Sequence, residues 1–356
     1  MNIVVGLSGG VDSAVAALLL KQAGHEVTAV FMKNWEEDDS SEYCSAKEDL
    51  EDACKIADKI GIELKTINFA TEYWDKVFEI FLDEYKKGRT PNPDVLCNSE
   101  IKFKAFLEYA NDLGATKIAT GHYATIHENN NIFYLKEAND KHKDQTYFLH
   151  RLNQYQLSHT MCPLSDIDKN QVRQIAKQNS FEVYNKKDST GICFIGQRRF
   201  KEFLNQYIPA NPGFIVDEKE QILGEHDGIY FYTIGQRQGL KIGGKKDYQN
   251  IPWFVLEKDI KNNKLIVGQN NNNPRLLKNN LIAYNCSWIN DDIQKYYKKP
   301  LLARIRHGQQ KQKCKFYPID DETIAVDFTD KQRAIAAGQA VVLYDNEICL
   351  GGAIIK

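Results

Sequence analysis

The chain has 356 residues, of which 42% are hydrophobic and 26% are charged. These values are typical of a globular protein with two or three domains, and they exclude disordered, collagenous and low-complexity classes. The formal net charge is only −2, whereas nucleic-acid-binding proteins are typically basic. A mean charge can hide segregated charges, so this argument against nucleic acid holds only if charge is spread evenly along the chain.

Cysteine usage and hydropathy indicate a reducing compartment. The 8 cysteines are scattered, and the sequence contains no CxxC pair and no His/Cys cluster with zinc spacing. The first residues form an apolar run without the basic region or cleavage site of a signal peptide. No uncharged apolar run approaches the ~20 residues of a membrane helix. We therefore expect a cytoplasmic protein with reduced cysteines, no membrane association and no resident metal site.

The first part of the chain alternates strand and helix patterns. Apolar runs predict strands, and segments of helical periodicity between them predict helices. This alternation indicates an α/β fold whose parallel sheet is covered by helices on both faces. Strands are expected at 3–5, 27–32, 64–68 and 117–120, helices at 13–23, 50–60, 71–85, 100–113, 145–158, 169–179 and 198–206, and a hairpin at 123–136.

After Pro209 the pattern changes to short β-rich runs separated by Gly, Asn and Pro. Strands are expected at 214–216, 229–233, 253–257, 264–267, 281–288, 301–306, 313–319 and 323–328, with a hairpin at 340–355. A polar seam at 270–274 divides these runs into two groups. We therefore predict a nucleotide-binding α/β domain at 1–207, a central β-rich domain at 208–270 and a small C-terminal β-barrel at 271–356.

A glycine-rich loop follows the first strand. It consists of Gly6, Leu7, Ser8, Gly9, Gly10, Val11, Asp12 and Ser13. Glycines allow the backbone to approach an anion, serines add hydroxyl donors, and the next helix adds free N–H groups and the positive end of its dipole. The loop matches neither GxxxxGK[ST] nor GxGxxG. The residues by themselves therefore predict a phosphate site, with a turn that binds nothing as the alternative.

Two cysteines stand apart from the other six. Cys97 ends a proline-stiffened loop in the segment TPNPDVLCN, and Cys193 lies in the segment DSTGICFIG. Lysines and arginines flank both segments, and positive surroundings favour the thiolate, the form that attacks or carries sulfur. Charge context alone leaves a reactive and a structural role equally open for these two cysteines. The other six are expected to be structural.

The small net charge conceals two segregated stretches. Residues 295–315 contain eight Lys/Arg and no acid, with tyrosines between them, which fits an RNA-binding surface; a solvated basic face is the alternative. Residues 36–52 carry nine acids and one lysine. Such a stretch could repel RNA and leave room for a protein partner, although solvation is its default interpretation. The net charge therefore does not exclude nucleic acid.

Several motifs occur together, and their combination is more specific than any one of them. They are GLSGGVDS, TPNPDVLCN, IKFKAF, ATGHYA, KDQTYFL, DSTGICFIG and YFYTIGQRQGL, in this order. The first resembles the SGGxDS pyrophosphate loop of the adenine-nucleotide α-hydrolase superfamily. The set resembles the bacterial tRNA-specific 2-thiouridylases, strongly from residue 6 to about residue 270 and more diffusely beyond.

The resemblance implies a tRNA-uridine 2-sulfurtransferase that acts on the wobble uridine, position 34 of tRNA. ATP would adenylate the uracil C2 oxygen with release of pyrophosphate and then AMP. Cys193 would carry a persulfide received from a sulfur-relay protein. Cys97 would attack that persulfide, freeing sulfide or closing a Cys97–Cys193 disulfide, and Asp94 would be a general acid/base.

The resemblance also implies binding residues. ATP, with Mg²⁺ on its triphosphate, would contact the glycine-rich loop, Met32 and Gly121. The residues implied to contact tRNA are Asn92, Pro93, Asp94, Lys143, Asp144, Gln145, Arg304, Ile305 and Arg306. Among them, residues 92–94 would touch the target uracil.

Two other functions stay open. A pyrophosphate-loop ligase or amidotransferase acting on a metabolite would form an adenylate without RNA, although the sequence shows no glutaminase segment. A nucleotide-regulated RNA-binding protein would bind tRNA without cleaving ATP between its α- and β-phosphates. The pair of cysteines favours the RNA sulfurtransferase.

Overall fold

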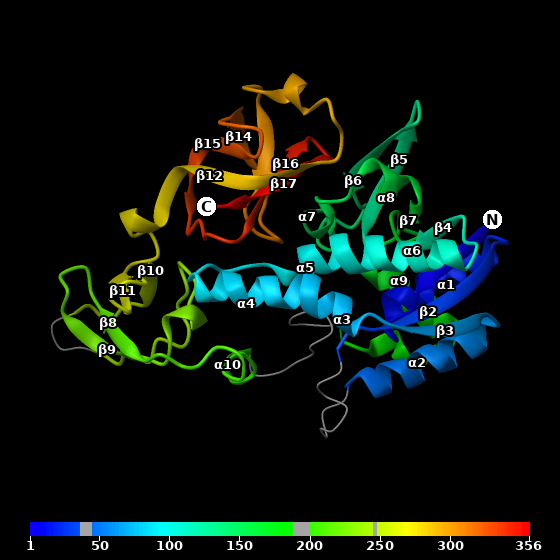
Figure 1. The fold of residues 1–356 in the computed structure, drawn as a ribbon, viewed down its shortest axis with the longest axis horizontal. Coiled ribbons are helices and arrows are strands. Elements are labelled where there is room, and N and C mark those ends of the chain that lie inside the picture. Colours follow the sequence, from blue (N-terminus) through cyan, green and yellow to red (C-terminus); the bar gives the residue numbers. More distant parts are fainter. Residues whose placement is uncertain (36–44, 188–199, 245–247) are drawn as a thin grey trace.

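The computed structural model describes residues 1–35, 45–187, 200–244 and 248–356. Figure 1 shows an α/β part that contains the N-terminus, a small β-sheet part at the opposite end of the molecule, and a β-barrel between and above them. The predicted fold class is confirmed, because a parallel sheet is followed by two smaller β-structures of which the last closes into a barrel.

The α/β part is built on a five-stranded parallel sheet of order β3-β2-β1-β4-β7. Its strands are β1 (Asn2–Gly6), β2 (Glu26–Lys33), β3 (Glu63–Asn68), β4 (Lys117–Ala119) and β7 (Thr160–Met161). Alternate residues of β1 enter different cores, since Ile3 and Val5 pack on one face and Val4 on the other. Strands covered on both faces read as continuous apolar runs. This explains the prediction of β1, β2 and β4. Strand β3 lies at the edge of the sheet and is partly exposed, and β7 is too short to show a pattern.

Helices cover both faces of this sheet. One face carries α1 (Val11–Gln22), α2 (Ser45–Ile60) and α9 (Lys169–Gln178). The other carries two longer helical segments, each with a π-helical stretch inside it. The first is α3 (Ala70–Tyr73), η1 (Trp74–Phe78) and α4 (Glu79–Lys86), and the second is α5 (Pro93–Leu96), η2 (Cys97–Ala105) and α6 (Phe106–Asp112). The helix predicted at 71–85 is confirmed. The helix predicted at 100–113 begins earlier, at Pro93, so Cys97 lies in a helical segment and not at the end of a loop.

The hairpin of β5 (Ala124–Asn129) and β6 (Ile132–Glu137) joins the α/β part to the barrel. Asn130 and Asn131 have φ values of 52° and 62°, the left-handed conformation that lets two residues reverse the chain. Strand β6 pairs with the barrel strand β17 (Ile348–Ile355). The α/β part and the barrel therefore share one hydrogen-bonded sheet.

The single helix predicted at 145–158 is wrong. The segment forms α7 (Thr146–Leu149) and α8 (Gln154–Ser158), and further along the chain lie η3 (Glu182–Asn185) and α10 (Phe200–Leu204). Asn153 begins α8 with a capping box, in which its side chain accepts from the Gln156 N–H at 2.9 Å. Leucines on both sides of the break enter the same core, which is why the apolar pattern continues across it.

The small sheet has the order β10-β11-β8-β9. Its strands are β8 (Gly213–Val216), β9 (Ile222–His226), β10 (Trp253–Asp259) and β11 (Lys264–Gln269). The strand predicted at 229–233 is wrong, because these residues begin with the 3-10 turn η4 (Ile229–Phe231). Ile229 and Tyr232 still enter the core of this part, so their apolar character reflects burial rather than a strand.

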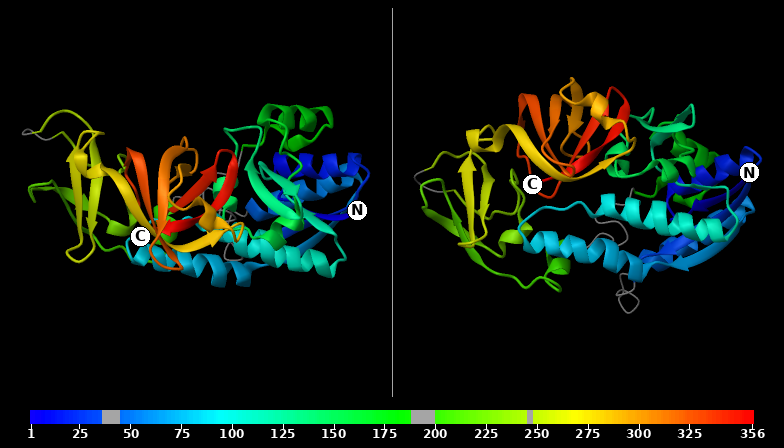
Figure 2. Two further views of the ribbon diagram at one scale, coloured as in Figure 1. Left: turned by 90° about the horizontal axis from the view of Figure 1, so that it is seen from above. Right: turned by 45° about the horizontal axis from the view of Figure 1, so that its top comes forward.

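The barrel is closed by its first and last strands. Its strands are β12 (Leu277–Trp288), β13 (Leu301–Arg304), β14 (Gln312–Pro318), β15 (Thr323–Arg333), β16 (Ala340–Asp345) and β17, with the 3-10 turns η5 (Pro274–Leu276) before β12 and η6 (Ile293–Tyr296) before β13. The long strand β12 pairs with both β15 and β17, which closes the ring around an apolar core. Figure 2 shows the barrel between the small sheet and the α/β part. In the described ranges, no helix is long and apolar enough to span a membrane.

Candidate active site

The glycine-rich loop is preformed at the carboxyl end of β1. Gly9 adopts a left-handed φ of 70°, and a Cβ atom there would lie 2.2 Å from the Asp49 carbonyl oxygen. The Ser13 Oγ accepts a hydrogen bond from the Ser8 N–H at 3.2 Å and donates to the Gly10 carbonyl at 3.0 Å. Gly10 then starts α1, whose first N–H groups have no partner inside the helix. The loop can therefore present backbone donors to an anion.

Two residues predicted to bind ATP lie against this loop. A Cβ on Gly6 would be 3.2 Å from Met32 Cε, so Met32 packs beside the entry to the loop. A Cβ on Gly121 would be 2.8 Å from the backbone of both Asp12 and Ser13. The structure thus brings Met32 and Gly121 to the loop from β2 and from the segment after β4.

Two lysines that the motifs do not assign to the loop also lie on it. Lys169, at the start of α9, places Nζ 2.7 and 2.8 Å from the two Asp12 carboxylate oxygens. Lys186 Nζ donates to the Gly9 carbonyl at 3.2 Å and contacts Asp49 at 2.7 Å and Asp52 at 2.6 Å. The loop lacks a lysine of its own, so these two supply cationic groups beside it. Their positions depend on the packing of α9 and α2 against α1, which a one-dimensional pattern does not show.

Burial lowers the pKa of Lys186, but its hydrogen bonds to Asp49 and Asp52 outweigh burial, so the pKa is raised overall. Lys186 therefore carries its charge at neutral pH. The sequence places Lys186 among the charges near Cys193, and the structure shows that it holds α2 against the phosphate loop. Two acids of the stretch 36–52, Asp49 and Asp52, are thus ion-paired with Lys186 while still partly exposed to solvent. Residues 36–44 of that stretch lie outside the described part.

A chain of hydrogen bonds connects the phosphate loop with the segment KDQTYFL. The Tyr123 hydroxyl donates to Asp12 Oδ1 at 2.8 Å. The backbone N–H of Tyr123 donates to Gln145 Oε1, and the Gln145 N–H donates to the Tyr123 carbonyl, both at 2.9 Å. Gln145, predicted to contact tRNA, is therefore two hydrogen bonds away from Asp12 in the phosphate loop.

The segment predicted to contact the target uracil forms the start of α5. The Asn92 side chain accepts from the Asp94 N–H at 3.1 Å and caps the helix, while Pro93 occupies its first turn. Residues 92–94 are thereby held in one tight turn. We call residues 90–94 the target-base loop.

Cys97 is the first residue of the π-helix η2 and is fully buried. It packs in the large core of the α/β part rather than facing solvent. Most of the cations near it in sequence are directed elsewhere: Lys104 contacts Glu100 at 3.1 Å, and Arg89 contacts Glu84 at 3.0 Å. A reaction at this sulfur therefore requires that the thiol first become accessible. Cys193, the other predicted catalytic cysteine, lies outside the described residues.

The other residues predicted to contact tRNA form a junction between the α/β part and the barrel. Arg304 donates to Asp144 Oδ2 at 2.6 Å and to Glu137 Oε1 at 2.9 Å, and all three side chains are almost completely buried. Ile305 is also buried, and Arg306 donates to the Ala334 carbonyl at 2.5 Å. Lys143 is half-buried beside them. In this conformation the charges of Arg304 and Asp144 satisfy one another, and their contact with tRNA stays a prediction.

His307 of the barrel packs against the segment KDQTYFL. Its ring lies 4.4 Å from that of Phe148, and its Nε2 is 3.3 Å from the Asp144 carbonyl oxygen. Burial lowers the pKa of His307, and the neighbouring Asp144 and the Asp94 carboxylate oppose this effect. The charge of Asp94, the predicted acid/base, thus acts on a residue of the barrel.

The basic stretch 295–315 divides into two groups. Arg304, Arg306 and Lys311 make internal contacts, and Lys295 pairs with Asp292. The other four are exposed on the barrel and form no ion pair with any residue that the structure describes: Lys298, Lys299, Lys313 and Lys315.

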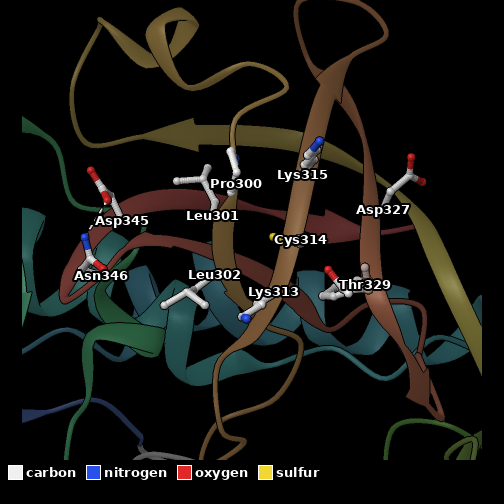
Figure 3. Close-up of a pocket in the computed structure, with 11 residues that line it drawn as sticks. Pro300, Leu301, Leu302, Lys313, Cys314, Lys315, Asp327, Thr329, Asp345 and Asn346 are labelled. Atoms are coloured by element: carbon white, nitrogen blue, oxygen red, sulfur yellow. Dashed lines mark hydrogen bonds between the residues drawn. The ribbon is translucent and has the colours of Figure 1, made fainter.

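Figure 3 shows a groove on the barrel beside two of these lysines. It is lined by Pro300, Leu301, Leu302, Lys313, Cys314, Lys315, Asp327, Phe328, Thr329, Asp345 and Asn346. Its lining contains two lysines and two aspartates, which form no ion pair with one another, and none of the predicted site residues lines it. This groove is therefore separate from the candidate active site.

The fold and the site define a class of protein. A parallel sheet whose first strand enters a glycine-rich phosphate loop is a nucleotide-binding α/β domain, here joined to two β-structures that meet it at the loop bearing Asp94. Family models agree: the tRNA methyl transferase HUP domain matches residues 1–197, the tRNA methyl transferase PRC-barrel domain 201–269, and the aminomethyltransferase beta-barrel domain 278–355.

Curated relatives match over the whole length. The tRNA-specific 2-thiouridylase MnmA of Francisella philomiragia is 54% identical over 356 residues, which is 99% of each chain. That of Nitrosomonas europaea is 53% identical over 354 residues, covering 99% of this chain and 98% of the relative. The chain belongs to the tRNA-specific 2-thiouridylase family, as its motifs predict.

Solved structures are less similar. NMN synthetase from Francisella tularensis has a TM-score of 0.34 at 19% identity and covers 56% of this chain and 71% of that one. A 4-thiouridine synthetase–RNA complex with bound ATP has a TM-score of 0.34 at 16% identity and covers 58% and 50%. Both TM-scores are too low to establish a shared overall fold.

Proposed function

We propose that the chain catalyses ATP-dependent 2-thiolation of the wobble uridine, position 34, of tRNA. The observation that carries this proposal is the full-length similarity to tRNA-specific 2-thiouridylases, together with a preformed phosphate loop in the same domain as the target-base loop. A uracil carbonyl is a poor electrophile, so the reaction needs an activated oxygen as leaving group, and an adenylate provides one.

The phosphate loop would bind the triphosphate through the backbone donors at the start of α1. Lys169 and Lys186, which are ion-paired with Asp12 and with Asp49 and Asp52, would hold the loop in its anion-binding conformation. The uracil C2 oxygen would attack the α-phosphorus, and the α–β bond would break with release of pyrophosphate. In the described residues no three His, Cys, Asp or Glu side chains cluster as a metal site. Mg²⁺ would therefore take most of its ligands from the triphosphate and water.

The target-base loop would hold the uracil, with Asp94 moving a proton between base and solvent. Cys193 would bring the terminal sulfur of a persulfide, supplied by a sulfur-relay protein. This sulfur would form the new bond to C2 as the C2–O bond breaks and AMP leaves. Cys97 would then attack the Cys193 sulfur. The bond between that sulfur and the transferred sulfur would break, which releases 2-thiouridine and leaves a Cys97–Cys193 disulfide for a cellular thiol to reduce.

Binding of tRNA would involve the α/β domain at 1–207 and the two β domains at 208–270 and 271–356. The exposed group Lys298, Lys299, Lys313 and Lys315 offers phosphate contacts on the barrel, which explains how a chain with little net charge can bind RNA. This activity belongs in the cytoplasm, where both tRNA and reduced thiols are found.

The test measures cleavage of ATP and thiolation in the same reaction. Wild-type protein should release pyrophosphate and AMP only when tRNA is present. Cys97→Ser and Cys193→Ser should abolish thiolation, whereas Cys349→Ser, which alters an equally buried free thiol in the barrel, should not. Thiolation by both serine variants would refute the two-cysteine mechanism.

The same reaction separates the alternative functions. Adenylate formation without RNA would favour a metabolite ligase. Binding of tRNA without cleavage of ATP would favour an RNA-binding protein. Methyl transfer to tRNA from S-adenosylmethionine would favour the activity named in the family-model descriptions.

A further inference from the structure

The barrel holds the backbone of the target-base loop directly. The Thr90 N–H donates to the Ala337 carbonyl at 2.8 Å, and Gln339 Nε2 donates to the Thr90 carbonyl at 2.7 Å. Both backbone hydrogen-bonding groups of Thr90 are therefore bound by the segment that leads into β16. A third contact comes from the small-sheet part, where the Thr233 hydroxyl lies 3.3 Å from that of Thr90.

The approach of the barrel at this point is too close for any side chain. Gly338 has a φ of 90°, and a Cβ atom there would lie 2.9 Å from the Thr90 nitrogen and 3.0 Å from Arg89 Cβ. Arg89 itself donates to the Tyr284 hydroxyl of β12 at 2.5 Å. Residues 89 and 90 are thus fixed by two separate parts of the barrel.

The residues that follow Thr90 couple its position to that of Asp94. Pro91 and Pro93 each lock their own φ and restrict the residue before them to extended conformations. Asn92, between the two prolines, has φ −116° and ψ 97° and caps α5. Few freely rotating bonds therefore separate the Thr90 carbonyl from Asp94, and a shift at Thr90 moves the whole loop.

We propose that Gln339 of the barrel is a positioning residue for the reaction: its hydrogen bond to the Thr90 carbonyl sets the orientation of the target-base loop. This inference rests on the proposed function for the role of Asn92 and Asp94. It gives the barrel a part in the chemical step in addition to RNA binding.

The test replaces Gln339 with methionine, which has a similar length and shape but no donor. The matched control is Gln312→Met, because Gln312 lies on the same barrel and its side chain contacts only the nearby Gln310 carbonyl among the described residues. Loss of one hydrogen bond should lower the single-turnover rate of pyrophosphate release about fivefold. The Kd for tRNA and the KM for ATP should stay within twofold of wild type, because Gln339 is not a binding residue.

A second measurement is independent of activity. Hydrogen exchange of the amides in residues 88–97 should be faster in Gln339→Met than in wild type and unchanged in Gln312→Met. Unchanged exchange there, or a lower tRNA affinity with an unaltered rate, would overturn the proposal. Should Gln339→Met unfold, Gln339→Asn, whose amide is one carbon too short to reach, serves as the same test. Failure of the wild type to make 2-thiouridine would refute the proposed function. The hydrogen-exchange measurement would still show whether Gln339 orders residues 88–97.

Discussion

Replacement of Arg304 by methionine tests how the α/β part is joined to the barrel. The guanidinium lies between the carboxylates of Asp144 and Glu137, whose side chains are 0% and 3% exposed, and is itself 10% exposed. Lys311 still contacts Glu137 at 2.9 Å when Arg304 is removed, so Asp144 is the group left without a cation.

The size of the effect follows from this burial. Breaking a buried ion pair by removing one partner costs about 3–5 kcal/mol, because the remaining charge is uncompensated. We therefore expect Arg304→Met to lower the free energy of unfolding by that amount. The control is Arg275→Met, which removes the exposed pair with Glu257 and should cost at most about 1 kcal/mol.

Urea denaturation followed by tryptophan fluorescence measures both variants, and a filter-binding assay with tRNA is run beside it. A large loss of stability identifies the arginine primarily as a structural link between domains. If Arg304→Met were as stable as wild type while its tRNA affinity fell more than tenfold, the reasoning would be refuted, and the guanidinium would be an RNA contact.

Three further changes test other parts of the account. Gly9→Ala adds a Cβ atom to a residue with a left-handed φ that lies close to the Asp49 carbonyl, so keeping the wild-type loop conformation would cost about 3 kcal/mol. The kcat/KM for ATP should therefore fall by about two orders of magnitude, while circular dichroism should show an intact fold. Tyr123→Phe deletes the hydrogen bond to Asp12 and should raise the KM for ATP roughly tenfold. Tyr147→Phe removes another buried hydroxyl and should leave the KM for ATP unchanged. Equal effects of the two variants would argue against a specific role of the Tyr123–Asp12 hydrogen bond in ATP binding. Burial lowers the pKa of His150 to about 4, so below pH 6.5 the unfolded chain binds a proton that the native state does not. The free energy of unfolding should therefore fall by up to about 3 kcal/mol between pH 6.5 and 4. A His150→Asn variant with the same pH dependence in urea denaturation would contradict this assignment.

Part of the fold can be predicted from the sequence because the central strands of the parallel sheet are buried on both faces. Val4 and its neighbours read as a buried strand, and the pair Asn130 and Asn131 reads as a hairpin turn. Short elements are less visible, since β7 has 2 residues and offers no periodicity. The break between α7 and α8 is hidden for a different reason, because leucines on both sides of it pack into one core.

The candidate site, like the fold, can be predicted from the sequence only in part. The phosphate loop is contiguous in sequence, and so it can be recognised from glycine and serine spacing. Lys169 and Gln339 reach the site from distant segments, and their roles follow only from the packing of α9 and the barrel. Arg304 stands out in the sequence as part of a basic run, yet its burial against two carboxylates is a property of the tertiary structure.

The central claim is tested most directly by nucleoside mass spectrometry of tRNA. Unmodified tRNA would be incubated with the protein, ATP, Mg²⁺ and a sulfur donor, then digested and analysed. The account predicts 2-thiouridine at position 34, with one AMP and one pyrophosphate formed for each sulfur inserted. A product of 4-thiouridine, a methylated nucleoside, or an unmodified uridine despite consumption of ATP would contradict it.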